Sequence, residues 1–192
     1  HYEVVAAHLQ AHLFQVTLTI AQPQAQQTVS LPVWIPGSYL VREFAKNLQK
    51  LHARQGKRAV CLQQTNKHTW VADCHGKAPL VLTYEVCAYD NSVRTAWLDA
   101  SRGFFNGTSL CLRVHGHEDA LHTLDIASNE ATAHWSVATG LAPQAIDKKG
   151  FGVYGASGYD ELVDCPVEMG TFWSGRFTAG GVPHRFVVAG AA

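Results

Sequence analysis

Charged residues are scarce in this sequence. Only 16% of its 192 residues are charged, and 15 Lys and Arg balance 15 Asp and Glu, so the formal net charge is zero. A typical soluble domain carries about 25% charged residues. A neutral, charge-poor chain lacks the basic surface that binds nucleic acid or an anionic membrane, and we expect neither partner. The low charge also indicates that part of the surface is covered by something else.

Long hydrophobic runs are absent as well. A membrane-spanning helix needs roughly 18 consecutive apolar residues. The longest apolar stretch here, residues 31–41, is interrupted by Pro32, Pro36 and Gly37. The sequence therefore predicts no membrane span.

Paired cysteines are missing too. The five cysteines are odd in number and form no Cys-x-x-Cys motif, which argues against a disulfide framework. We predict reduced, mostly buried thiols in a cytoplasmic protein. The sequence opens on His1 and ends in an apolar run, and we interpret it as a piece of a longer polypeptide.

Helical periodicity is rare, whereas period-two alternation of apolar residues recurs along the chain. The clearest strands are predicted over residues 14–20, 29–35, 80–88 and 110–114, with turns at the intervening Gly and Pro. One helical turn is predicted at 159–163. We therefore expect residues 1–192 to form a single all-β domain, an antiparallel β-sandwich or saddle with little helix. Its core should include Phe14, Val16, Leu18, Leu82, Tyr84, Val86, Leu112 and Val114.

A complete catalytic or metal-binding set is not recognisable. His117 and His122 flank a Glu as in the metallopeptidase motif His-Glu-x-x-His, but they are five residues apart instead of four. On a helix that spacing turns the second imidazole well away from the first. His115-x-His117 would put two imidazoles on one strand face, with no identifiable third ligand. We predict no metal site in this sequence and expect the 192 residues alone to be inactive.

The tryptophans allow two interpretations. Five Trp, about one per predicted strand, could line a carbohydrate or peptide groove, or they could fill the core of the sandwich. Aromatic residues scattered in this way are more often core residues, and we favour that interpretation. The five are Trp34, Trp70, Trp97, Trp135 and Trp173.

Three ordered segments are more specific than a generic sandwich. They are LPVWIPGSYLVREF at 31–44, RGFFNGTSL at 102–110, and YDELVD followed by PVEMG at 159–170. Together they resemble the N-terminal domain of the glycyl aminopeptidase family, zinc metallopeptidases related to aminopeptidase N. The resemblance extends from about residue 2 to about residue 190.

The resemblance implies a protein of several domains, in which catalysis belongs to a domain other than this one. Such proteins have an N-terminal β-sandwich, a thermolysin-like catalytic domain that binds zinc, and a PDZ-like domain. The zinc ligands are not in this sequence, so the resemblance implies no catalytic residue and no cofactor here, with zinc in the downstream domain. The partners implied are the protein's own catalytic domain and a peptide substrate that loses its N-terminal Gly or Ala.

The resemblance also implies a substrate-proximal loop. In the related aminopeptidases a loop between two strands borders the cleft near the amino end of the substrate, and residues 98–108 correspond to it. Asp99, Arg102 and Asn106 are the polar residues expected there, with Asp99 as a partner for the substrate ammonium. A local role remains open: Asp99 pairing with Arg102, and Asn106 supplying an Asn-Gly hairpin turn. A stand-alone module that binds peptide or carbohydrate is the alternative function.

Overall fold

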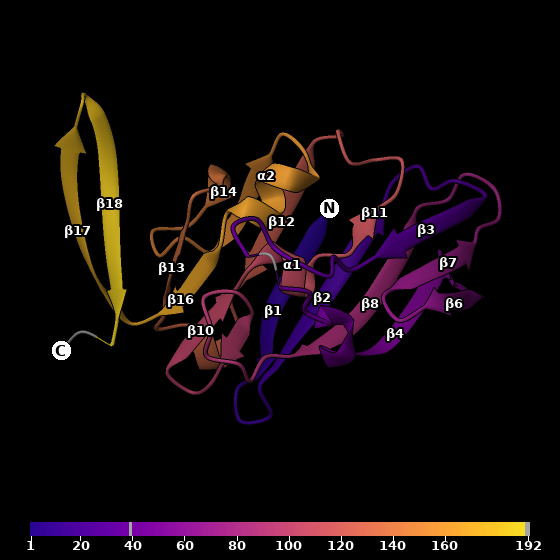
Figure 1. Cartoon of the computed structure of the whole chain (residues 1–192), viewed down its shortest axis with the longest axis horizontal. Coiled ribbons are helices and arrows are strands. Elements are labelled where there is room, and N and C mark those ends of the chain that lie inside the picture. The colour runs from indigo at the N-terminus through magenta and orange to yellow at the C-terminus, as the bar shows by residue number, and fades with distance from the viewer. Residues whose placement is uncertain (39, 191–192) are drawn as a thin grey trace.

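The computed structural model describes residues 1–38 and 40–190 of the chain, and strands dominate it (Figure 1). The largest unit is an eight-stranded sheet. Its strands, in spatial order, are β14 (Ala142–Ile146), β15 (Gly152–Ala156), β12 (His122–Ala127), β1 (Tyr2–His8), β2 (Leu13–Ile20), β8 (Leu80–Cys87), β4 (Leu48–Gln55) and β5 (Arg58–Val60). The predicted all-β class is confirmed.

Two four-stranded sheets and one hairpin complete the strand content of the described residues. One sheet has the order β13 (Ser136–Thr139), β16 (Val167–Gly170), β10 (Arg102–Phe105) and β9 (Ala96–Leu98). The other has the order β11 (Arg113–Val114), β3 (Gln26–Ser30), β7 (Thr69–Asp73) and β6 (Leu62–Asn66). The hairpin consists of β17 (Phe172–Ala179) and β18 (Val182–Ala189).

Helical segments are short. They are η1 (Phe44–Asn47), α1 (Gly107–Leu110), η2 (Glu130–Thr132) and α2 (Tyr159–Asp164). The predicted turn at 159–163 is α2, which is confirmed, and Pro166 follows its end. None of the helices described is long or apolar enough to cross a membrane.

The core lies on one face of the large sheet. Val16 pairs with Tyr84 and Leu18 with Leu82 across β2 and β8, and all four are at most 1% exposed. All eight core residues predicted from the alternation are buried. Phe14 of β2 meets Phe105 of β10 edge to face, with 5.5 Å between ring centroids, and joins the large sheet to the sheet of β10. Burial of each such side chain contributes about 1.5–3 kcal/mol.

The sequence predicted antiparallel strands throughout, but the large sheet contains one parallel pair. β1 is antiparallel to β2 but runs parallel to β12, with Tyr2 opposite Leu124 and Val4 opposite Ile126. More than a hundred residues separate these two strands. Apolar and polar residues alternate in a strand whether it pairs in parallel or antiparallel. The sequence pattern of β1 and β12 therefore does not show which way they pair.

The predicted strand at 29–35 is too long. β3 ends at Ser30, the amide of Leu31 donates to His68 O at 3.0 Å, and the chain then leaves the sheet. Pro32 has no N–H to continue the ladder. Gly37 takes a φ of +76° in the turn that follows, a backbone conformation that glycine adopts readily. Tyr39 of this segment lies outside the described residues.

The predicted strand at 110–114 is mostly wrong. Residues 107–110 form α1, and strand pairing is limited to β11. Leu110, Cys111 and Leu112 are all 0% exposed, so burial here does not alternate as it does in a strand. The predicted Asn-Gly hairpin turn is also wrong, because Asn106 is the N-cap residue of α1.

The core interpretation of the tryptophans holds only in part. Trp70 and Trp135 are buried and Trp97 is half-buried, but Trp34 is 51% and Trp173 56% exposed. All five cysteines are free thiols, but the prediction that most of them are buried holds for only two. Cys74 and Cys111 are buried, Cys87 and Cys165 half-buried, and Cys61 exposed.

Candidate functional site

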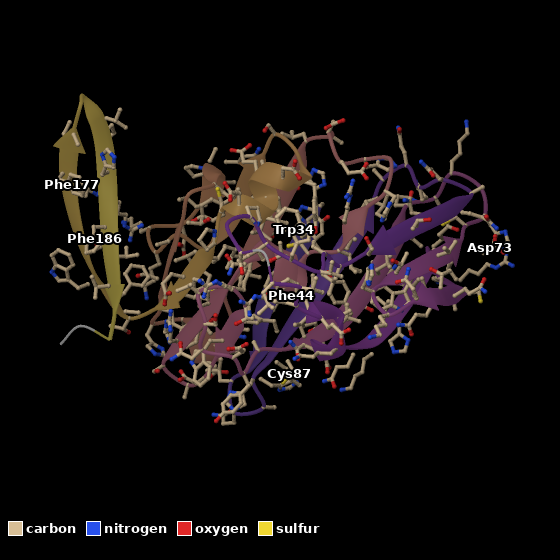
Figure 2. The ribbon with its side chains drawn as sticks, viewed as in Figure 1. Trp34, Phe44, Asp73, Cys87, Phe177 and Phe186 are labelled. Atoms are coloured by element: carbon tan, nitrogen blue, oxygen red, sulfur yellow. The ribbon has the colours of Figure 1, made fainter. Side chains whose placement is uncertain are left out.

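A groove of about 810 Å³ lies between the segment that follows β3 and helix α2. Trp34 lines the groove on the side of the segment after β3, and Asp160 and Asp164 line it on the side of α2. Thr108 of α1 and Arg113 of β11 also line it. Figure 2 labels Trp34 in the middle of the molecule, where α1 and α2 lie in Figure 1. Two of the three sequence segments that carry the family resemblance therefore meet in this groove, and the third supplies Thr108.

Three buried tyrosines hold the chain just after α1. The hydroxyl of Tyr84 donates to Leu110 O at 2.6 Å, that of Tyr159 to Cys111 O at 2.8 Å, and that of Tyr2 to Leu112 O at 2.7 Å. The three phenols thus satisfy three successive carbonyls that have no sheet partner. Burial raises the pKa of each phenol, so the donors stay protonated, and it raises the pKa of the Cys111 thiol to about 12.

Helix α1 packs directly against α2. A Cβ on Gly107 would lie 2.9 Å from Leu162 O and 3.0 Å from Val163 Cα, so only glycine permits this approach. The next residue, Thr108, is 1% exposed, and its Oγ1 has no hydrogen-bond partner. A buried polar atom without a partner is uncommon in proteins. Thr108 is also one of the residues that line the groove.

The charges along the groove are predominantly acidic. Asp160 and Asp164 are exposed and form no side-chain hydrogen bond with the described residues. Glu161 accepts from the hydroxyl and amide of Ser157 at 2.6 and 2.7 Å, which lowers the pKa of Glu161. Arg113 is neutralised by Glu118, with 2.9 Å between Nη2 and Oε1. The uncompensated carboxylates favour a cationic group such as an ammonium.

Two of the three histidines considered as metal ligands, His115 and His122, make other contacts. His115 Nε2 lies 2.8 Å from Ser30 Oγ, and His122 Nδ1 lies 2.7 Å from Ala120 O. The His122 ring stacks on Tyr2 and meets Tyr159 edge to face, and burial lowers its pKa. Across the described residues no group of three or more His, Cys, Asp or Glu is arranged to hold a metal ion. These residues do not fit a zinc centre.

Asp99 binds the backbone of its own turn. Its carboxylate accepts from Trp97 Nε1 at 3.0 Å, from the amide and hydroxyl of Ser101 at 2.7 and 2.8 Å, and from the Arg102 amide at 2.8 Å. Burial acts to raise the pKa of Asp99, but these hydrogen bonds outweigh it, and the pKa lies below its usual value. The carboxylate therefore stabilises the connection between β9 and β10.

Arg102 and Asn106 lie at opposite ends of β10. The guanidinium of Arg102 forms a bidentate pair with Glu168 of β16, at 2.7 and 2.9 Å, which raises its pKa. The local pairing of Asp99 with Arg102 is therefore made through the Arg102 amide, while the guanidinium pairs with Glu168. Asn106 is buried and donates from Nδ2 to Val93 O at 2.6 Å. None of the three predicted residues lines the groove.

The sequence reasoning missed the residues that line the groove. Thr108, Asp160 and Asp164 all lie within segments that carried the resemblance, but we assigned them no role. Their positions in the sequence could have pointed to them. Thr108 follows a glycine, Asp160 lies in the predicted helical turn, and Asp164 directly follows that turn, in a chain that is otherwise β. That signal does not specify which side chains converge, because the convergence depends on α1 packing against α2.

The fold is shared with parts of larger peptidases. The crystal structure of an aminopeptidase N family protein from Idiomarina loihiensis superposes with a TM-score of 0.95 at 38% identity, covering 99% of this chain and 32% of that one. An M1 zinc metallopeptidase from Deinococcus radiodurans shares the fold at a TM-score of 0.51 and 14% identity, covering 100% of this chain and 47% of that one. No curated protein matches the sequence. In both structures the matched β fold is one part of a longer chain.

The family follows from the sequence itself. The profile of the peptidase M61 N-terminal domain matches residues 1–171, and the chain belongs to this family. The chain spans about a third of the length of the Idiomarina protein.

Proposed function

We propose that this chain is the N-terminal accessory domain of a zinc-dependent aminopeptidase that releases N-terminal Gly or Ala from peptides. The domain packs on the catalytic part of the same protein and borders its substrate cleft. The observation that carries the proposal is the peptidase-family match over residues 1–171. The 38% identity to a much longer aminopeptidase N family protein supports it. Localisation in the cytoplasm is part of the same proposal.

The groove is the part of the domain that we assign to the peptide. Asp160 and Asp164 supply negative charge for an amino terminus, and Thr108 Oγ1 supplies an unpartnered polar atom beside it. A charge-assisted hydrogen bond contributes about 1.5–3 kcal/mol. In this proposal the zinc that activates water is held by residues outside the described ones, and the domain binds and orients the peptide.

We expect Thr108→Val to lower kcat/KM on Gly- and Ala-peptides in the longer enzyme by roughly 2- to 12-fold, which corresponds to a hydrogen bond of about 0.5–1.5 kcal/mol. The melting temperature should not fall, because Oγ1 makes no bond within the domain. The matched control is Thr95→Val. Thr95 Oγ1 donates to Asp90 O and contacts Ser92 O away from the groove, so this variant should lose stability and keep its activity. Equal activity of the Thr108→Val and native enzymes would exclude Thr108 from the cleft.

Asp99 provides a separate test of the loop at 98–108. If its carboxylate binds the substrate ammonium, Asp99→Ala lowers kcat/KM by roughly 10- to 150-fold. Because four donors of its own turn already surround this carboxylate, we expect the substitution to lower the melting temperature and to change kcat/KM less than threefold. A large loss of kcat/KM at an unchanged melting temperature would instead establish the substrate-binding role.

A further inference from the structure

The hairpin β17–β18 has no strand partner beyond itself in the part of the chain that is described. Its two strands pair from Phe172 opposite Ala189 to Ala179 opposite Val182. Figure 1 shows it projecting at one end of the molecule, apart from the packed sheets. An isolated two-stranded hairpin is marginally stable in water. Strand pairing within the hairpin alone therefore contributes little stability.

One face of the hairpin is apolar and aromatic. The side chains of Trp173, Phe177, Val182, His184, Phe186 and Val188 share this aromatic face because paired residues point to the same side. Trp173 meets Phe186 edge to face at 6.5 Å, and Phe177 stacks on His184 at 4.9 Å. Trp173, Phe177 and Phe186 are each more than half exposed. Gly175 leaves room for the Trp173 ring, which a Cβ there would approach to 2.5 Å.

The opposite face carries two arginines, one of which contacts the domain. Arg176 and Arg185 are directly paired across the strands. The Arg185 guanidinium reaches Val137 O at 3.5 Å and lies 5.5 Å from the Phe172 ring centroid. The aromatic face therefore points away from the domain. Figure 2 shows Phe177 and Phe186 on the projecting hairpin, remote from the large sheet.

We propose that the aromatic face is the docking surface for the remaining polypeptide of the same protein, so that the hairpin belongs structurally to the neighbouring catalytic part. This inference rests on the proposed function. The matched M61 N-terminal domain ends at residue 171, and β17 begins at Phe172. The Idiomarina structure nevertheless matches 99% of this chain, which includes most of the hairpin, within a chain about three times as long. The aromatic face carries no Asp, Glu, Lys or Arg, which is typical of a permanently buried interface.

Hydrogen exchange of residues 172–189 tests the proposal. The measurement compares the 192-residue chain with the longer polypeptide encoded by the same reading frame. We expect the hairpin amides to exchange about a hundredfold more slowly in the longer polypeptide, because the docked strands open only when the interface does. Equal rates in the two proteins would overturn the proposal. A dimer of the 192-residue chain with a protected hairpin would also overturn it, because the occupant would then be a second copy.

A double variant tests the same proposal through the melting temperature. Phe177→Ser combined with Phe186→Ser should lower the melting temperature of the longer polypeptide and leave that of the 192-residue chain unchanged. The matched control is Thr178→Ala, on the opposite face of β17, which should change neither. A fall in both proteins would contradict the docking role. Peptidase activity is assayed separately. If the longer polypeptide is inactive but its hairpin is protected from exchange, the proposed function alone is rejected. If it is active but its hairpin is unprotected, this inference alone is rejected.

Discussion

Replacing Phe105 with alanine is expected to destabilise the domain by about 3–5 kcal/mol, the usual cost of removing a buried phenylalanine ring. Phe105 is 0% exposed and meets Phe14 at 5.5 Å, so its ring fills the space between the sheet of β10 and the large sheet. The backbone of β10 is paired on both sides, with β9 and β16, and it limits how far the cavity can collapse. Urea denaturation followed by tryptophan fluorescence measures the loss as a lower midpoint at constant slope.

Phe104→Ala is the matched control. Phe104 is the preceding residue of β10, and because strand residues alternate between faces its ring lies on the opposite side. It is half-buried, and the Arg102 guanidinium lies over its ring at 5.5 Å from the centroid. We expect its replacement to cost less than about 1.5 kcal/mol. Equal costs for the two variants would contradict the packing of the two sheets through Phe105. Phe105→Leu extends the comparison if the alanine variant does not fold.

Tyr84→Phe is expected to cost about 1–3 kcal/mol, although it removes a single oxygen. The hydroxyl donates to Leu110 O at 2.6 Å and accepts from the Leu112 amide at 3.4 Å, both fully buried. Without it, the carbonyl and the amide keep their desolvation penalty and have lost their partner. Thermal unfolding of the variant measures the effect.

The control for Tyr84 is Tyr89→Phe. Tyr89 is 64% exposed, and its hydroxyl makes no hydrogen bond within the described part of the chain. We expect this substitution to change stability by less than about 0.5 kcal/mol. A Tyr84→Phe domain as stable as the Tyr89→Phe domain would show that water or a backbone shift replaces the phenol.

The strands of the large sheet were predictable because one physical cause produces both the pattern and the structure. Val16 and Leu18 alternate with polar residues because one face of β2 lies on the core and the other on solvent. The same reasoning failed at residues 110–112. There the chain buries consecutive residues, and the bonds that allow this come from Tyr2, Tyr84 and Tyr159, which are distant in sequence.

The candidate site was less predictable than the fold. The resemblance pointed to the loop before α1, and none of its three predicted residues, Asp99, Arg102 and Asn106, lines the groove. It did not identify Thr108 or Asp160. The type of a residue shows that it can form a hydrogen bond or carry charge, but the packing around it determines which partner it takes. Asp99 illustrates this, since its carboxylate is surrounded by donors of its own turn.

The parallel pairing of β1 with β12 imposes an order of assembly on the chain. β1 sits in the middle of the large sheet, between β2 and β12. During synthesis, β2 becomes available soon after β1, but β12 is complete only after residue 127 has been made. Until then β1 is an unprotected strand edge, open to pairing with other chains. Long-range closure of this kind slows folding. The nascent N-terminal half therefore presents its greatest aggregation risk before β12 covers it, and truncation before residue 122 would make that exposure permanent.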